Sequence, residues 1–210
     1  MSDRYRVTRI DELPEVPVPN AGIVWRPIRR TLGISAFGVN AYRADPGQSV
    51  VEDHTEEGLG HEELYVVVAG RARFELDGET FDAPAGTLVF LREPAVRRHA
   101  VAEEVGTTVL AIGGKPGEPF APSDWEWAFA AAPLAAEEDW EGAAELLRQG
   151  LEERGERPRL LYDLGCYEAR ASRLDEAEAH VKRAIELDPT IAEWAVRDDD
   201  LAAIRGRLAV

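Results

Sequence analysis

The sequence predicts a mainly β domain followed by a helical domain, and three observations support this fold class. Between about Arg26 and Gly113, apolar residues alternate or form short runs that are interrupted by turn signals. From Trp125 onward, apolar residues recur at helical spacing. Residues 114–124, between these patterns, are rich in glycine and proline and indicate a linker. We therefore expect an antiparallel β-sandwich or barrel over 26–113 and helices over 125–210.

Composition and charge exclude several classes of protein. The 210-residue chain is 45% hydrophobic and carries a formal net charge of −16. Because this charge repels phosphate backbones and anionic lipids, we expect no nucleic-acid partner and no membrane partner. The charged N-terminus lacks the apolar centre of a secretion signal, so a cytoplasmic location is expected. The single cysteine, Cys166, excludes an internal disulfide and is predicted to be a buried thiol.

The first 25 residues, with Pro14, Pro17 and Pro19, indicate an extended arm. Such an arm is expected to add an edge strand or to pack across a neighbouring chain. Asp77-Gly78 predicts a tight hairpin, because both turn residues of that hairpin need positive φ. Short strands in close succession are typical of a sandwich or barrel. We expect strands over residues 35–42, 64–69, 73–76, 80–83, 87–91, 98–101 and 107–112.

The apolar spacing after residue 125 predicts paired helices, one around residues 160–167 and another over 174–187. Pro189 is expected to stop the second helix. This stretch resembles the tetratricopeptide helix-turn-helix repeat through Leu161, Leu164, Gly165, Ala177, Val181, Ala184 and Pro189. A shift of one repeat period, 34 residues, lands on Trp127, Ala130, Ala131, Ala143, Leu147, Gly150 and Gly155. The resemblance implies antiparallel helices that approach closely at small residues.

Two residues depart from the repeat pattern. Pro133 is expected to interrupt the first copy, and Glu168 stands where the repeat usually has an aromatic residue. His180 is expected to lie on a helix surface. A capped terminal helix over residues 194–208 is expected to cover the last repeat.

The strand-rich region also holds a candidate metal centre. His54, His61 and His99 lie in this region, and Glu63 follows the first two closely. Imidazole and carboxylate groups on neighbouring strands suit a divalent transition metal. Since alternate residues of a strand share a face, Glu63 is expected to point the same way as Tyr65. The ordinary alternative is a solvated acidic loop with surface histidines.

The spacing of these residues resembles the two motif blocks of the cupin superfamily, small β-barrels that commonly hold one divalent metal. The interval from Glu63 to Gly70 and the interval from Pro94 to His99 agree with the two blocks, and Gly86 fits the glycine ahead of the second block's strand. The resemblance implies an antiparallel jelly-roll barrel whose metal ligands lie at its open mouth.

The resemblance implies two alternative ligand sets, because the family's His-x-His is His54-x-Glu56 in this chain and a longer loop follows. In the first set, the metal is held by His54, Glu56, Glu63 and His99. In the second set, His61 takes the place of Glu56. Either set, with water in the open positions, suits Fe(II), Mn(II), Ni(II) or Zn(II).

The function implied by the resemblance is a metal-binding cupin barrel that receives a small molecule in its mouth. Tyr65, Arg73 and Phe90 are the expected pocket residues. The helical region would provide a surface for a protein partner, and the chain is expected to form a homodimer. An active enzyme of this kind would be a metal-dependent oxygenase or isomerase. The alternative is a metal-free cupin that acts as a sensor or scaffold in protein–protein interactions.

Overall fold

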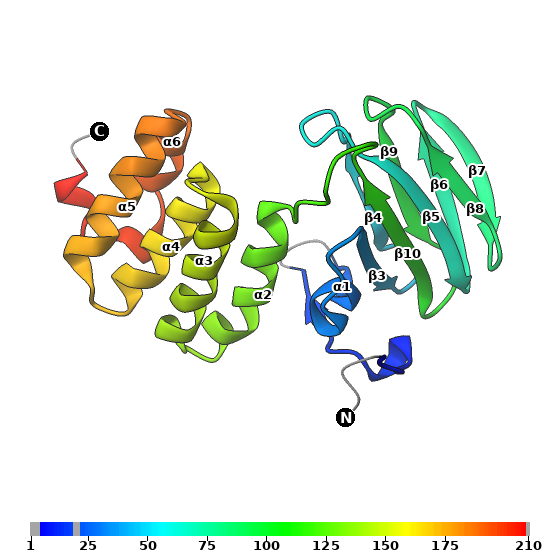
Figure 1. Cartoon of the computed structure of the whole chain (residues 1–210), viewed down its shortest axis with the longest axis horizontal. Helices are drawn as coiled ribbons and strands as arrows, with labels where there is room; N and C mark the ends of the chain where they lie inside the picture. Colours follow the sequence, from blue (N-terminus) through cyan, green and yellow to red (C-terminus); the bar gives the residue numbers. More distant parts are fainter. Residues whose placement is uncertain (1–4, 19–21, 209–210) are drawn as a thin grey trace. The chain divides into compact units, whose positions relative to one another are not determined.

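In a computed structural model, the chain divides into two compact units, Met1–Pro122 and Ser123–Val210 (Figure 1). The structure describes residues 5–18 and 22–208. Residues 1–4 and 19–21 of the expected arm, with Pro19 among them, lie outside the described residues, as do 209–210.

The first unit begins with the arm, which joins a β-sheet. After the 3₁₀-helix Ile10–Glu12, β1 (Val16–Pro17) pairs with β2 (Val24–Arg26), and β2 pairs with β3. The predicted edge strand is therefore present. A short helix that the sequence analysis did not predict, α1 (Ile28–Leu32), follows and ends at Gly33, whose φ of 71° is a conformation that favours glycine.

The remaining strands of this unit, together with β1 and β2, form two antiparallel sheets. They are β3 (Gly38–Ala44), β4 (Ser49–His54), β5 (Glu62–Ala69), β6 (Arg71–Leu76), β7 (Glu79–Pro84), β8 (Leu88–Leu91), β9 (Arg98–Ala102) and β10 (Thr107–Gly114). One sheet has the order β1-β2-β3-β10-β5-β8 and the other has the order β4-β9-β6-β7. The antiparallel fold class is confirmed as two sheets, and closure into a barrel stays a prediction.

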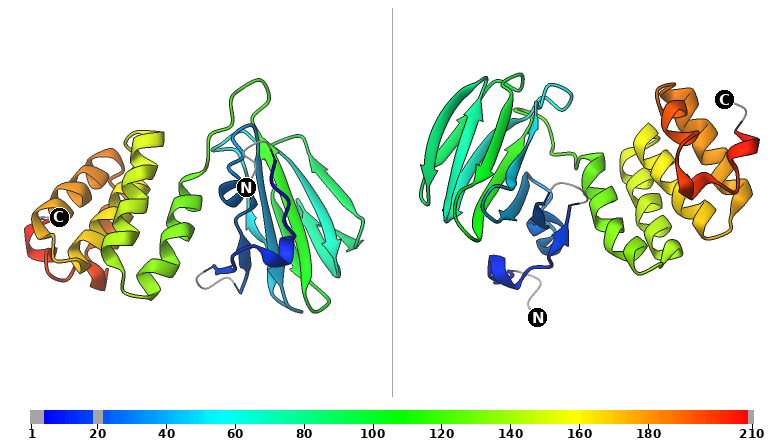
Figure 2. Two further views of the ribbon diagram at one scale, coloured as in Figure 1. Left: turned by 60° about the horizontal axis from the view of Figure 1, so that its bottom comes forward. Right: turned by 180° about the vertical axis from the view of Figure 1, so that it is seen from behind.

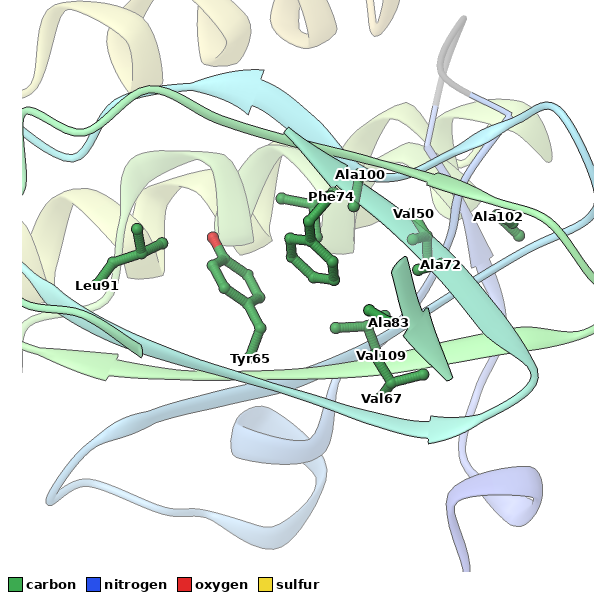
Figure 3. Close-up of a cluster of buried hydrophobic side chains, with 12 residues drawn as sticks. Val50, Tyr65, Val67, Ala72, Phe74, Ala83, Leu91, Ala100, Ala102 and Val109 are labelled. Carbon is green, nitrogen blue, oxygen red and sulfur yellow. The ribbon is translucent and has the colours of Figure 1, made fainter. Parts of the chain in front are cut away.

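The predicted hairpin at Asp77-Gly78 is confirmed, since it joins β6 to β7 and its two turn residues have φ of 48° and 87°. Side chains from both sheets meet in one hydrophobic core (Figure 3). Tyr65 of β5 and Phe74 of β6 lie in this core with ring centroids 5.8 Å apart. Because alternate residues of a strand share a face, the inward row of β5 runs from Val67 through Tyr65 to Glu63.

The second unit begins with four consecutive long helices, α2 (Asp124–Ala136), α3 (Trp140–Arg154), α4 (Pro158–Arg170) and α5 (Leu174–Leu187) (Figure 2). Each packs on the next, and α2 also contacts α4. At Gly165 of α4, an added Cβ would come within 2.5 Å of Val181 Cγ2 of α5, which explains the need for a small residue there. The tetratricopeptide assignment itself stays a prediction.

Two expectations for this unit are wrong. Pro133 does not interrupt its helix, because α2 continues through it and ends three residues later, at Ala136. The terminal segment is also not one helix: α6 (Ile191–Ala195) is followed by the 3₁₀-helices Asp199–Leu201 and Arg205–Arg207.

Consecutive aspartates explain the broken terminal helix, since their side chains compete for backbone hydrogen bonds. The Asp198 side chain accepts a hydrogen bond from the backbone N–H of Asp200 at 3.0 Å. The segment nevertheless packs Leu201, Ile204 and Leu208 into the cluster formed by α4 and α5. Within the described ranges, no helix has the length and apolar character needed to cross a bilayer.

Candidate metal centre

Three potential metal ligands from β4, β5 and the loop between them lie together. His54 is the last residue of β4, Glu63 is the second residue of β5, and Glu56 belongs to the connecting loop. One ligand atom from each residue lies within 4.8 Å of the other two. Because zinc takes nitrogen and carboxylate ligands at about 2.0–2.2 Å, atoms this close together can share one cation.

The backbone of β4 orients His54 for metal binding. Its Nδ1 lies 2.8 Å from the carbonyl oxygen of Glu52, and a carbonyl only accepts, so Nδ1 carries the hydrogen. Nε2 faces the carboxylates, 3.5 Å from Glu56 Oε1 and 4.0 Å from Glu63 Oε2. In the neutral ring, Nε2 therefore holds the lone pair that a metal needs. The His54 side chain is 34% exposed, which leaves this group open to solvent.

Glu56 supplies a buried negative charge. Burial raises its pKa, but interactions with His54 and His61 outweigh this effect and lower the pKa to about 2. His61 Nδ1 lies 3.2 Å from Glu56 Oε2, and the His61 ring packs on Phe120 at a centroid distance of 5.9 Å. The contact with His61 is not a well-aligned hydrogen bond, and within the described residues the buried Oε2 has no other donor. A cation would compensate this oxygen.

Glu63 is held from its inner side. Tyr65 donates its hydroxyl hydrogen to Glu63 Oε2 at 2.7 Å, and Arg98 Nε lies 3.5 Å from the same oxygen. Burial raises the pKa of Glu63. Burial and the Glu63 charge also raise the pKa of Tyr65 well above its usual value, so this phenol stays a donor. Burial lowers the pKa of His54, but Glu56 and the Glu52 carbonyl reverse the effect and leave it raised.

The expected last ligand, His99, lies outside this group, which corrects the expectation from motif spacing. In β9, Arg98 and Ala100 are buried while His99 is only partly buried. Because neighbouring residues of a strand face opposite ways, His99 points out of the sandwich, where its Nε2 lies 2.9 Å from Ser49 Oγ. The pairing of β4 with β9 shifts register twice and sets Arg98 opposite His54. Sequence reasoning missed Arg98 as the inward residue.

Two of the three expected pocket residues also face outward. Tyr65 is buried beside the candidate ligands, and its role in a small-molecule pocket stays a prediction. Arg73 is exposed on β6, next to the inward-facing Phe74, and its Nη1 pairs with Glu103 Oε1 at 3.3 Å. Phe90 is 54% exposed on β8. Strand alternation accounts for both corrections.

No family model and no curated protein matches the chain. Among solved structures, the chain is similar to a cupin protein from Bacteroides fragilis, with 20% identity and a TM-score of 0.39 over 53% of this chain and 92% of that chain. It is also similar to an RmlC-like cupin from Shewanella frigidimarina, with 16% identity and a TM-score of 0.42 over 59% and 96% of the two chains. A third is a sugar phosphate isomerase from a cupin superfamily, from Silicibacter pomeroyi, with 17% identity and a TM-score of 0.43 over 57% and 83%. Similarity at this level indicates no activity, ligand or cofactor for this chain.

Proposed function

We propose that this chain is a cupin-type protein that holds one divalent metal ion at His54, Glu56 and Glu63 and binds a small molecule beside it. The proposal also gives the helical unit a role as a surface for a protein partner or a second copy of the chain. The observation that carries the metal site is the convergence, within 4.8 Å, of one imidazole nitrogen and two carboxylate oxygens. The carbonyl-bonded Nδ1 of His54 supports it, because that bond leaves Nε2 as the ligand atom.

The donor set fits a divalent transition metal. One imidazole and two carboxylates suit Fe(II), Mn(II), Ni(II) or Zn(II). Glu56, with a pKa of about 2, is ionised at neutral pH and needs no proton release before it binds a cation. His61, beside Glu56, would either orient that carboxylate or add a second imidazole to the set. A bound metal would act as a Lewis acid on an oxygen of the small molecule.

The chain's own residues would fix the geometry around such a metal. Tyr65 stays protonated and donates a hydrogen bond to Glu63, which holds this carboxylate at the inner side of the site. The Glu52 carbonyl fixes the ring of His54. The partly exposed side of His54 would admit water and the small molecule to the open coordination positions.

A metal-free sensor or scaffold is the second candidate function, and Arg98 is the observation that favours it. Its buried guanidinium lies 3.5 Å from Glu63 Oε2 and gives the site a permanent positive charge. His99, the ligand expected from the second motif block, faces away. In this alternative, the barrel acts through its surface and its helical unit.

A metal titration separates the two functions. The full chain, purified without a metal-affinity tag and stripped with a chelator, is titrated calorimetrically with Mn²⁺, Ni²⁺ and Zn²⁺, and with Fe²⁺ under anaerobic conditions. The metal proposal predicts one equivalent bound by the wild type and strong loss of affinity in His54→Ala and Glu63→Gln. His99→Ala is the matched control, since it removes an outward-facing imidazole from the same unit. No binding to the wild type, or equal loss in His99→Ala, contradicts the proposal.

A further inference from the structure

Arg98 is a buried guanidinium next to a proposed metal ligand. Its side chain is 0% exposed, and its Nη1 donates a hydrogen bond to the Pro94 carbonyl at 3.2 Å. Its Nε lies 3.5 Å from Glu63 Oε2. Within the described part of the chain, Nε and Nη2 make no hydrogen bond and are shielded from solvent. A buried charge with unused donors is strongly unfavourable unless a nearby anion compensates it.

Glu63 is the anion available to Arg98. Of the carboxylates in the described residues, only Glu63 lies within 4.0 Å of this guanidinium. The same oxygen, Oε2, already accepts the hydroxyl hydrogen of Tyr65 at 2.7 Å. Two donor groups from different strands, β5 and β9, therefore converge on one oxygen of this carboxylate. Such outer partners fix the rotamer of a metal-binding carboxylate.

We infer that Arg98 is a positioning residue for the metal site and acts through Glu63. This inference rests on the proposed function, because it concerns the same site. Arg98 occupies the inward position of β9, next to the outward-facing His99. In this inference, the second motif block does not supply a metal ligand; it supplies a guanidinium that orients Glu63. Because its free donors are shielded from solvent, Arg98 reaches a bound small molecule only through Glu63.

Arg97 provides a matched control. It is the neighbouring residue in the chain, its side chain is 68% exposed, and it faces the other way. Its Nε and Nη2 each donate to a carboxylate oxygen of Asp53 at 2.6 Å. Arg97→Met therefore removes one guanidinium close to β9 without touching Glu63.

The test is a Co²⁺ titration of the full chain, followed by the visible absorption of the bound ion. Arg98→Met is expected to weaken Co²⁺ binding about 10- to 100-fold and to change the absorption bands, because a misplaced Glu63 alters the coordination. Arg98→Lys is expected to restore part of the affinity, and Arg97→Met to match the wild type. Circular dichroism of each variant checks folding.

A double-mutant cycle shows whether the effect passes through Glu63. In the Glu63→Gln background, Arg98→Met is expected to cause no further loss of Co²⁺ affinity. Full additivity of the two changes, or an Arg98→Met variant with wild-type or tighter binding and an unchanged spectrum, overturns the inference. If Arg98→Met does not fold, Arg98→Lys takes its place in the cycle and the same criterion applies.

The inference and the proposed function fail in different ways. If the wild type binds no Co²⁺, the proposed function fails and the inference fails with it. If the wild type binds Co²⁺ and the Arg98 variants bind it equally well, only the positioning role is refuted.

Discussion

Replacing Glu56 with glutamine is expected to destabilise the metal-free chain most strongly between pH 4.5 and 6.5. The folded pKa of Glu56 is about 2, below its ordinary value of 4.5, so its stabilisation is complete above pH 4.5 and is lost as the pH falls toward 2. The pKa of His54 is raised above 6.5, so its stabilisation is complete below pH 6.5 and is lost as the pH rises through the folded pKa. Both contributions are complete together only in this window.

The size of the effect follows from the Glu56 shift. The difference between 4.5 and about 2 is about 2.5 units, and one unit corresponds to about 1.36 kcal/mol, which gives an upper limit of about 3.4 kcal/mol. The partner His54 is 34% exposed, so solvent screens the interaction. We therefore expect Glu56→Gln to lower the free energy of unfolding by about 1–2 kcal/mol at pH 5.5.

Hydrogen exchange followed by mass spectrometry measures this loss in peptides from β4 and β5 of the metal-free full chain. Glu57→Gln is the matched control, because Glu57 is the next residue in the loop and is exposed. The difference between Glu56→Gln and the wild type should shrink as the pH rises through the folded pKa of His54, because His54 then loses its charge. Equal protection of the two proteins at pH 5.5, or an equal loss in Glu57→Gln, would show that the Glu56 charge does not stabilise this part of the chain.

Three further predictions concern the helical unit. Glu168→Ala should lower the free energy of unfolding of this unit by about 3 kcal/mol in urea, because it removes a fully buried carboxylate and leaves Arg148 and His180 without it; an unchanged midpoint contradicts this. Gly165→Ala should lower the free energy of thermal unfolding by about 1–3 kcal/mol, because the added Cβ would clash with Val181 Cγ2. Gly206→Ala, with open space around it, should leave this free energy unchanged. Cys166 is buried, and burial raises the pKa of its thiol. A thiol reagent should therefore modify it only as fast as the unit unfolds. Rapid modification of the native chain would contradict this prediction.

The sequence was sufficient to predict the inward row of β5. Glu63, Tyr65 and Val67 alternate with residues of the other face, and the structure confirms that Tyr65 and Val67 are buried. This prediction succeeds because strand alternation is a local property of the backbone. The same reasoning predicted the hairpin at Asp77-Gly78, since its turn depends on two adjacent residues.

The face of β9 could not be predicted in the same way. His99 was expected to face inward only from the spacing of the second motif block, and Arg98–Ala102 has no large apolar side chain on the face of Arg98 and Ala100 that would have marked it as the inner face. The structure instead places Ala100 inward, paired with Phe74, a large side chain whose neighbours have to be small. The register shifts between β4 and β9 also made the face of His99 unpredictable, because irregular strand pairing cannot be recognised from motif spacing.

In the helical unit, Glu168 shows why a local pattern is incomplete. The repeat pattern marks this position as aromatic, and the structure buries a carboxylate there. Arg148 of α3 lies 3.2 Å from Glu168 Oε1, and His180 Nδ1 of α5 lies 2.6 Å from Oε2. His180 is therefore paired with a buried acid, which differs from the plain surface histidine expected. The apolar periodicity of α4 alone cannot predict partners that come from α3 and α5.

Anomalous diffraction from crystals of the full chain grown with Zn²⁺ is the most direct test of the metal centre. We expect one strong peak about 2.0–2.2 Å from His54 Nε2 and from one oxygen each of Glu56 and Glu63. A peak bound by His99, or the absence of any peak near His54 at saturating zinc, would contradict it.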